Sequence, residues 1–295
     1  MRHTQHNNNN NTLQKYYCCI ATAAQNRLLF TYTQKGQKMK KVRKIVIINQ
    51  KGGVGKSTVS VNLAYGLAKK KYNTLLIDLD PQAHASCIYK KQISKEDTTS
   101  NLFLDKRFNI QNIVFKAEIN QEQEDNLFII PSSIHLALVA EQILSSTYRE
   151  SLLHKQLEKV SKEHEFIILD CPPTLGVITI NAIYTADLII IPTNYGRYSL
   201  DGIADLFDSI KEIKEGQDYE FKILRNLYEK RSSQTNSYIE KELKPFSNNL
   251  FNTIIRKNEA INQSQINGTP VQIFNPNSSG SKDFSQLVEE FLINV

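Results

Sequence analysis

Short, continuous apolar runs recur along the chain from residue 44 onward, and each one ends in polar or turn-forming residues. The runs are KIVIIN (44–49), NTLLIDLD (73–80), NLFIIPSS (126–133), EFIILDCPP (165–173) and ADLIIIPTN (186–194). A run of this length without polar alternation is typical of a strand that is covered on both faces. The pattern therefore predicts the strands of a buried parallel sheet.

Segments with helical periodicity lie between several of these runs. The segment STVSVNLAYGLAKKK (57–71) has apolar residues at helical spacing and a basic last turn, which complements the helix dipole. Further helix-like segments lie around 147–164, 175–185 and 199–214. Alternating strands and helices predict an α/β fold with one doubly wound, mostly parallel sheet. No repeat or linker follows Met39, so we expect residues 39–295 to form a single domain.

Residues 1–38 have a different character. They contain the run HNNNNN and show no sustained helical or strand period. This composition predicts a disordered tail, or an artefact of the choice of start site, with no part in the chemistry. Met39 stands directly before the first predicted strand, so our preferred interpretation is that the natural chain begins there.

The formal charge of +6 is concentrated near the N-terminus. Residues 1–44 hold nine basic residues and no acidic residue, which leaves 27 basic against 30 acidic residues in 45–295. The net charge of the main part of the chain therefore gives no support for DNA binding. Any contact with DNA would have to come from a local basic patch.

Residue usage also disfavours a membrane span and a cysteine-ligated metal. The chain contains no run of about 18 apolar residues, the length that a transmembrane helix needs. Its cysteines show no metal-ligand spacing, and we expect them to be reduced thiols of a cytosolic protein. They are Cys18, Cys19, Cys87 and Cys171.

The stretch NQKGGVGKST (49–58) follows the first predicted strand and opens a predicted helix. Its three glycines let backbone N–H groups surround phosphate oxygens at a helix N-terminus. Lys56 would then reach the terminal phosphates, and the Ser57 hydroxyl would hold Mg²⁺. Two positions are unusual: Gln50 stands where the strict pattern has glycine, and Lys51 is one lysine more than such a loop needs.

Aspartates follow two of the other predicted strands. Asp170 ends the run FIILD and is suited to hold Mg²⁺, which takes few protein ligands. A strand-end aspartate that caps a helix is the alternative. Asp78 and Asp80 are two residues apart on an extended chain, so both would face the phosphates. One would assist the metal and the other would orient an attacking water, and the residues alone do not rank them.

Four stretches together resemble the ParA/MinD family of deviant Walker A ATPases, and most closely its short, Soj-like partitioning members. They are KGGVGKST (51–58), LLIDLDPQAHAS (75–86), FIILDCPPTLG (166–176) and IPTNYGRYSLDGI (191–203). The resemblance implies a P-loop NTPase fold with ATP and Mg²⁺ as cofactors. It also implies slow, Mg²⁺-dependent ATP hydrolysis that a ParB-like centromere-binding partner stimulates.

The family resemblance also assigns roles to individual residues. Lys51 would reach across an ATP-bound sandwich homodimer to the phosphates of the other subunit, and Asp80 would orient the hydrolytic water. Asp170 and Asp78 would assist the ion that Ser57 ligates. The residues placed against the nucleotide are Lys51, Gly52, Gly53, Val54, Gly55, Lys56, Ser57 and Thr58.

Family members often carry Ile-Pro-Arg-Asn on the adenine side, where this chain has Ile254-Ile255-Arg256-Lys257. Backbone contacts to adenine through Ile255 and Lys257 are compatible with this departure, whereas a side-chain amide contact at Lys257 is not. The resemblance further implies nonspecific DNA binding and a cytoplasmic, nucleoid-associated location, with plasmid or chromosome as cargo. The candidate DNA contacts are Arg225, Lys230, Arg231, Arg256 and Lys257.

Three rival functions are disfavoured by the residues, and one is left open. A MinD-like ATPase that cycles on a membrane would need a basic amphipathic C-terminal helix, whereas this chain ends SKDFSQLVEEFLINV. An iron–sulfur relative would need bridging cysteines, and Cys171 has no suitable companion. A tyrosine-kinase relative would carry a C-terminal tyrosine cluster, and no tyrosine follows Tyr238. A nucleotide-gated switch with negligible turnover is the remaining alternative.

Overall fold

The computed structural model describes residues 42–196, 201–217 and 219–294. The predicted leader at 1–38, with Cys18 and Cys19, lies outside the described residues, as do the first two residues of the helix predicted at 199–214. Within the described part, no helix has both the length and the apolar character that crossing a membrane requires.

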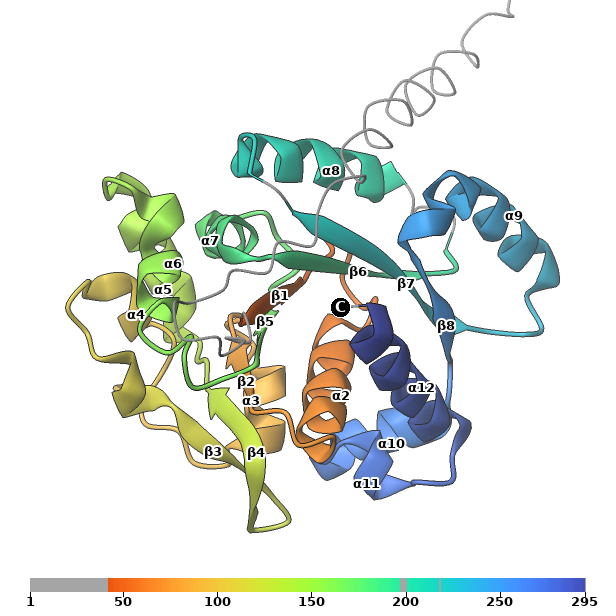
Figure 1. Cartoon of the computed structure of the whole chain (residues 1–295), viewed down its shortest axis with the longest axis horizontal. Helices are drawn as coiled ribbons and strands as arrows, with labels where there is room; N and C mark the ends of the chain where they lie inside the picture. Colours follow the sequence, from red (N-terminus) through yellow and green to blue (C-terminus); the bar gives the residue numbers. More distant parts are fainter. Residues whose placement is uncertain (1–41, 197–200, 218, 295) are drawn as a thin grey trace, which may run out of the picture.

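The strands form one eight-stranded sheet in the order β3-β4-β2-β5-β1-β6-β7-β8. All neighbouring pairs are parallel except β3 and β4, which are antiparallel. The predicted doubly wound, mostly parallel sheet is therefore confirmed (Figure 1). The strands are β1 (Arg43–Ile47), β2 (Thr74–Asp78), β3 (Phe115–Ile119), β4 (Glu122–Ile130), β5 (Phe166–Asp170), β6 (Leu188–Asn194), β7 (Glu220–Tyr228) and β8 (Leu250–Arg256).

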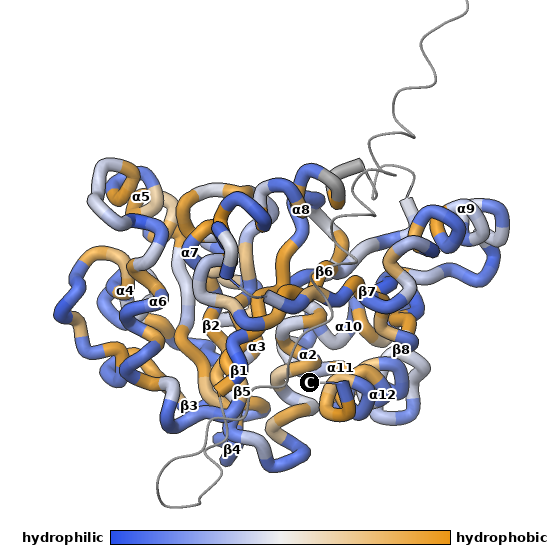
Figure 2. Tube along the Cα trace, turned by 45° about the horizontal axis from the view of Figure 1, so that its top comes forward, coloured by the Kyte–Doolittle hydropathy of each residue, from blue (hydrophilic) through white to orange (hydrophobic). Residues whose placement is uncertain are grey.

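Two hydrophobic cores cover the two faces of the sheet, because successive strand residues point to opposite sides. In β1, Ile45 and Ile47 belong to one core, and Val46 belongs to the other. Figure 2 shows the apolar residues gathered along the strands and the inner sides of the helices, with polar segments outside. The continuous apolar runs of the sequence follow from this burial on both faces.

Helices α2, α3, α10, α11 and α12 contribute to the core on one face, and α4 to α9 contribute to the core on the other. Figure 1 shows α2 and α12 on the opposite side of the sheet from α7 and α8. The helices are α2 (Lys56–Lys69), α3 (His84–Tyr89), α4 (Asn101–Leu104), α5 (His135–Gln142), α6 (Leu152–Leu157), α7 (Val177–Thr185), α8 (Asp201–Lys214), α9 (Ser233–Leu243), α10 (Glu259–Asn267), α11 (Val271–Phe274) and α12 (Ser279–Asn294), with 3-10 turns η1 (Ile110–Ile113), η2 (Ile143–Ser145), η3 (Arg149–Ser151) and η5 (Lys244–Asn249).

The helix predicted around 147–164 is wrong in its extent. Only α6 is α-helical there, because the chain enters through the 3-10 turn η3 and leaves through tight turns such as Val160 N–H to Leu157 O and Glu163 N–H to Val160 O. Tyr148, with a φ of 59°, blocks any extension of the helix toward the N-terminus.

Parallel pairing brings the carboxyl ends of β1, β2 and β5 to one edge of the sheet. The register sets Asp170 beside both Ile47 and Asp78. The loop that follows β1 and the aspartates that end β2 and β5 therefore meet at the position where ligands bind in open α/β sheets.

Candidate nucleotide-binding site

The loop between β1 and α2 has the backbone conformation that its glycines allow. Gly53 and Gly55 have φ values of 71° and 87°, which side-chain-bearing residues rarely adopt. At Gly55, an added Cβ would also lie 2.4 Å from Nδ2 of Asn226. The loop leads directly into α2, which begins at Lys56 with no acidic residue in its first turn and no capping side chain. This helix N-terminus is a suitable site for an anion.

Two asparagines hold the loop in place, and neither was identified from the sequence. Asn49 donates to Pro192 O at 2.8 Å and accepts from Lys51 N–H at 2.9 Å, so it ties the start of the loop to β6. Asn226, at the end of β7, donates to Val54 O at 2.8 Å. Its own Oδ1 accepts from Leu227 N–H, which fixes the orientation of the amide. Both asparagines are buried.

Lys56 lies inside the site rather than on the surface. Its Nζ donates to Lys51 O at 3.1 Å across the loop. Burial lowers the pKa of Lys56, while the nearby charges of Asp170 and Asp80 oppose this shift. The structure therefore brings the lysine and the two carboxylates into one electrostatic site.

Lys51 is half-buried and folds back onto its own chain. Its Nζ donates to Asn194 Oδ1 at 3.3 Å, at the end of β6. The additional lysine is therefore close to the phosphate loop, next to the residue that ends a central strand.

Asp170 has the features of a cation ligand. It is fully buried, and its Oδ1 accepts from Ser60 Oγ at 2.8 Å, whereas its Oδ2 has no hydrogen-bond partner. Burial raises its pKa to about 8, the charge of Asp78 adds to the rise, and hydrogen bonds from Ser57 and Ser60 lower it. Ser60 lies one turn after Ser57 on α2, a helical spacing that could have identified it from the sequence.

The structure distinguishes Asp78 from Asp80. Both oxygens of Asp78 accept hydrogen bonds, Oδ1 from Asp80 N–H at 3.0 Å and Oδ2 from the Ser86 N–H and hydroxyl at 2.8 and 2.7 Å. Burial raises the pKa of Asp78 to about 6, and the bonds from Ser86 act against that rise. Asp80 Oδ1 accepts from Gln82 N–H at 2.9 Å. Asp78 therefore stabilises the β2–α3 connection. If it also assists a metal, it would do so while its carboxylate keeps these hydrogen bonds.

The donor set fits Mg²⁺ better than a metal held entirely by protein. The described residues contain no group of three or more His, Cys, Asp or Glu side chains that could hold a metal ion together. Mg²⁺ usually takes one or two carboxylates and completes its shell with phosphate and water. Asp170, which has one unpartnered oxygen and interacts with the Ser57 hydroxyl, matches that requirement. Among the described cysteines, Cys171 is buried and Cys87 is exposed, and both are free thiols.

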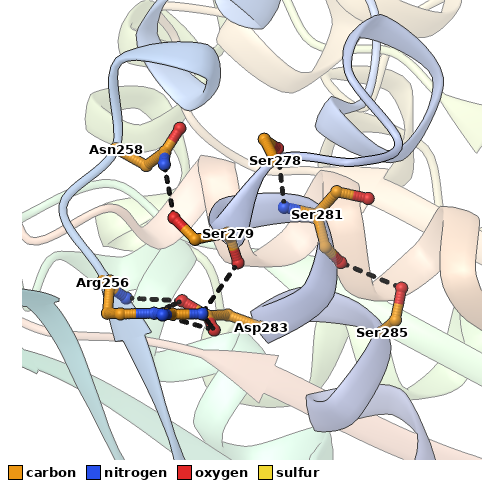
Figure 3. A network of polar contacts seen from close by, with 7 residues as sticks. All are labelled: Arg256, Asn258, Ser278, Ser279, Ser281, Asp283 and Ser285. Carbon is orange, nitrogen blue, oxygen red and sulfur yellow. Dashed lines mark hydrogen bonds and ion pairs between the residues drawn. The ribbon is translucent and has the colours of Figure 1, made fainter.

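The predicted adenine-side segment lies at the end of β8, where α12 holds it. Ile255 is buried. Arg256 forms an ion pair with Asp283 and donates from its backbone N–H to the same carboxylate at 2.9 Å. Asn258 donates to the Ser279 hydroxyl and caps α10 by accepting from Ala260 N–H. Figure 3 shows this network joining the β8 end to the first turns of α12.

The five candidate DNA-contacting residues fall into two groups. Arg225 donates to Glu240 and to Phe251 O, and Lys257 forms an ion pair with Glu229. Together with Arg256, these residues have acidic partners within the chain. Lys230 and Arg231 are exposed beyond the end of β7.

A glycine-rich loop opening a helix at the carboxyl edge of a parallel sheet, with buried strand-end aspartates beside it, defines a P-loop nucleoside-triphosphatase fold. A family model described as an AAA domain matches residues 42–223. The sporulation initiation inhibitor protein Soj of Bacillus subtilis (strain 168) is 31% identical over 254 residues, which cover 85% of this chain and 98% of Soj. This chain belongs to the ParA/MinD family of ATPases, on its Soj-like side.

Two further relatives support that placement. The chromosome partitioning protein ParA of Myxococcus xanthus (strain DK1622) is 31% identical over 254 residues, which cover 85% of this chain and 88% of that protein. The crystal structure of a plasmid partition protein from Borrelia burgdorferi B31 bound to AMPPNP has a TM-score of 0.68 at 26% identity. The match covers 86% of this chain and all of that one.

Proposed function

We propose that this protein is a slow, Mg²⁺-dependent ATPase that dimerises when it binds ATP, binds DNA without sequence preference and partitions a plasmid or chromosome. In this proposal a ParB-like protein stimulates its turnover, and the ATP-bound form is cytoplasmic and associated with the nucleoid. The observation that carries the proposal is the pair of loop lysines. Lys56 is buried against the acidic strand ends, and Lys51 is half-buried at the opening of the loop.

The residues of the loop suit ATP because they offer positive charge and backbone donors at one point. The amides of the α2 N-terminus would bind the phosphates, and Lys56 would neutralise the terminal ones. Ser57 and Asp170 would hold Mg²⁺, which offsets phosphate charge when bound. Asp80 would orient the attacking water and accept its hydrogen bond. Asp78 would keep the β2–α3 connection, and therefore Asp80, in position through the bonds it accepts.

Lys51 would serve the second subunit. In the free chain its Nζ donates to Asn194, and the interaction at 3.3 Å is long enough to be exchanged for a phosphate oxygen. A lysine that enters the partner's site would couple ATP binding to dimerisation. It would also stabilise charge in the transition state, as an arginine finger does.

The test compares two alanine variants that share the site. Lys51→Ala should bind one ATP per chain through Lys56 and the loop amides, remain monomeric and show no measurable hydrolysis. Asp80→Ala keeps the dimer contacts and loses the water-orienting group, so it should accumulate as an ATP-bound dimer. Light scattering with Mg-ATP measures the mass of each variant, and phosphate release measures turnover.

Two outcomes would overturn the dimer mechanism. One is a Lys51→Ala protein that dimerises as well as the wild type, and the other is an Asp80→Ala protein that stays monomeric with ATP bound. Wild-type protein that dimerises but releases no phosphate, even with DNA and a ParB-like partner, would instead identify a nucleotide-gated switch.

A further inference from the structure

Helix α5 and the residue that precedes it present an exposed apolar face. Ile134 and Leu138 are 63% and 65% exposed, and they lie four residues apart, so they project from the same side of the helix. Ala137 is also exposed, whereas Leu136 and Val139 on the other side are buried in the core. We name Ile134, Ala137 and Leu138 the α5 face. Figures 1 and 2 both show α5 at the same end of the molecule as α4 and α6.

The α5 face follows the same edge of the sheet as the nucleotide site. β4 runs parallel to β2, and Ile130 at its end is the register partner of Ile77. The residues after Ile130 therefore leave the sheet beside Asp78. Helix α5 begins shortly after this point, at His135.

Hydrogen bonds connect the two sites directly. Ser86 Oγ donates to Asp78 Oδ2 at 2.7 Å and accepts from Ser132 N–H at 2.8 Å. Ser132 stands two residues before Ile134, and Asp78, Ser86 and Ser132 are all buried. Ser86 thus holds Asp78 and the start of the α5 face in a fixed relation.

From this placement we infer that the α5 face is a contact between the two copies of the ATP-bound dimer, an inference that rests on the proposed function. If Lys51 of each copy enters the site of the other, the two carboxyl edges must face each other. A stable protein interface buries roughly 800 Å² per partner and involves about 20–30 residues a side. The loop 51–58 covers only part of that area, so the interface must extend along the edge, where the α5 face supplies apolar surface.

The chemistry of α5 favours a second copy over DNA or a membrane. The helix, HLALVAEQ, contains no lysine or arginine, and its exposed surface includes the acidic Glu141. DNA and anionic lipid both require basic residues, so neither is a suitable partner for this surface. A closed two-fold dimer uses the same surface on both copies, and apolar faces of this kind meet without charge repulsion.

The experiment introduces a negative charge on the α5 face in one variant. A second variant carries the same charge at the opposite end of the molecule and serves as the control. Leu138→Asp should weaken the dimer formed with Mg-ATP by at least about tenfold, because the interface would have to bury two carboxylates. ATP affinity per chain, measured by calorimetry, should stay unchanged, and so should the melting temperature. Leu138→Met, which keeps an apolar side chain, should dimerise like the wild type.

Ile293→Asp is the matched control. Ile293 is 82% exposed near the end of α12, one turn after Glu289, which forms an ion pair with Lys70 just beyond the far end of α2. The control should leave the dimer unchanged. All variants are made in the full chain and repeated with Asp80→Ala, which is expected to retain ATP.

The outcomes distinguish a failure of the α5 contact from a failure of the proposed ATP-dependent dimer. Wild-type and Asp80→Ala proteins that both stay monomeric with Mg-ATP would overturn the dimer and the inference with it. A wild-type dimer with a Leu138→Asp variant that dimerises equally well would overturn the inference alone. In that case, loss of stimulation by the ParB-like partner in Leu138→Asp would assign the α5 face to that partner instead.

Discussion

Two charged regions of this protein use their charges in opposite ways. At the nucleotide site, Lys56 and Asp170 are buried without an ion-pair partner at hydrogen-bonding distance among the described residues, and one oxygen of Asp170 has no partner at all. At the β7–β8 edge, Arg225, Arg256 and Lys257 are each matched with a carboxylate of the same chain. Burial of charge is costly unless it is compensated.

The difference indicates which region is prepared for a ligand. Burial at the nucleotide site lowers the pKa of Lys56 and raises that of Asp170, and a bound phosphate and cation would relieve both shifts. The charges at the β7–β8 edge are already satisfied, so these three residues serve the fold first. Lys230 and Arg231, which are exposed next to them, remain the better candidates for DNA.

The largest expected effect is on ATP binding. Lys56→Ala removes a charge-assisted contact to the terminal phosphates and should lower ATP affinity by roughly 100-fold or more, beyond detection in a calorimeter at ordinary concentrations. Lys241→Ala, an exposed lysine on α9, removes the same charge outside the site and should leave affinity within about twofold. Equal affinities for the two variants would refute the site assignment.

The sequence predicted the central part of this fold better than its edges. Strands β1, β2, β5 and β6 lie in the middle of the sheet and are apolar on both faces, so their runs are continuous. The strands β3, β7 and β8, at or next to the edges, were not predicted, whereas β4, which is also next to an edge, was predicted from the buried apolar residues of its second half. In the unpredicted strands, residues such as Lys116, Arg225 and Asn252 interrupt the apolar pattern.

The candidate site divides in the same way. Lys56 and Asp170 were predictable because the chemistry of each is set by residues adjacent in the chain. Asn226 was not, because it acts on Val54, which lies 172 positions away. The acidic partners of Arg225 and Arg256 likewise come from α9 and α12, and only the folded chain brings them together. The site assignments themselves remain predictions until they are measured.

The second expected effect is on stability at the β7–β8 edge. Asp283 is buried and accepts from both the guanidinium and the backbone of Arg256, so Asp283→Ala should lower the free energy of unfolding by about 2 kcal/mol. Glu229 and Lys257 form a solvent-exposed pair, so Glu229→Ala should cost no more than about 0.5 kcal/mol. Urea denaturation measures both values. Similar losses would show that burial does not separate the two pairs.

A smaller effect is expected on DNA binding in the presence of Mg-ATP. The double variant Lys230→Ala with Arg231→Ala should weaken binding to DNA. The slope of log affinity against log salt should fall by up to about 0.9 for each phosphate that the variant no longer neutralises. Its stability should not change, since both side chains are exposed. Arg225→Ala should instead lower the free energy of unfolding and leave the slope of log affinity against log salt unaltered. A lower slope for Arg225→Ala would mean that its ion pair with Glu240 opens when DNA binds.

The smallest expected effect concerns a buried ionisable group that has neither a ligand site nor an ion pair. His164 packs edge-on against Phe128, and neither ring nitrogen has a hydrogen-bond partner. Burial lowers the pKa of His164, and the adjacent Glu163 only partly opposes the shift. The unfolded chain therefore takes up a proton near its ordinary pKa of about 6.5, while the folded chain resists it. The contribution of His164 to the free energy of unfolding is therefore fully present at pH values above the ordinary pKa. It decreases as the pH falls toward the lowered pKa of the folded chain.

Replacing the imidazole with a ring that cannot be protonated isolates this contribution. His164→Phe should narrow the difference in melting temperature between pH 7.5 and pH 5.5, because the variant has no group at 164 to protonate. His84→Phe is the control: His84 is exposed on α3, and its replacement should leave the difference unchanged. If His164→Phe loses as much stability on acidification as the wild type, burial of His164 does not contribute to the pH dependence of stability.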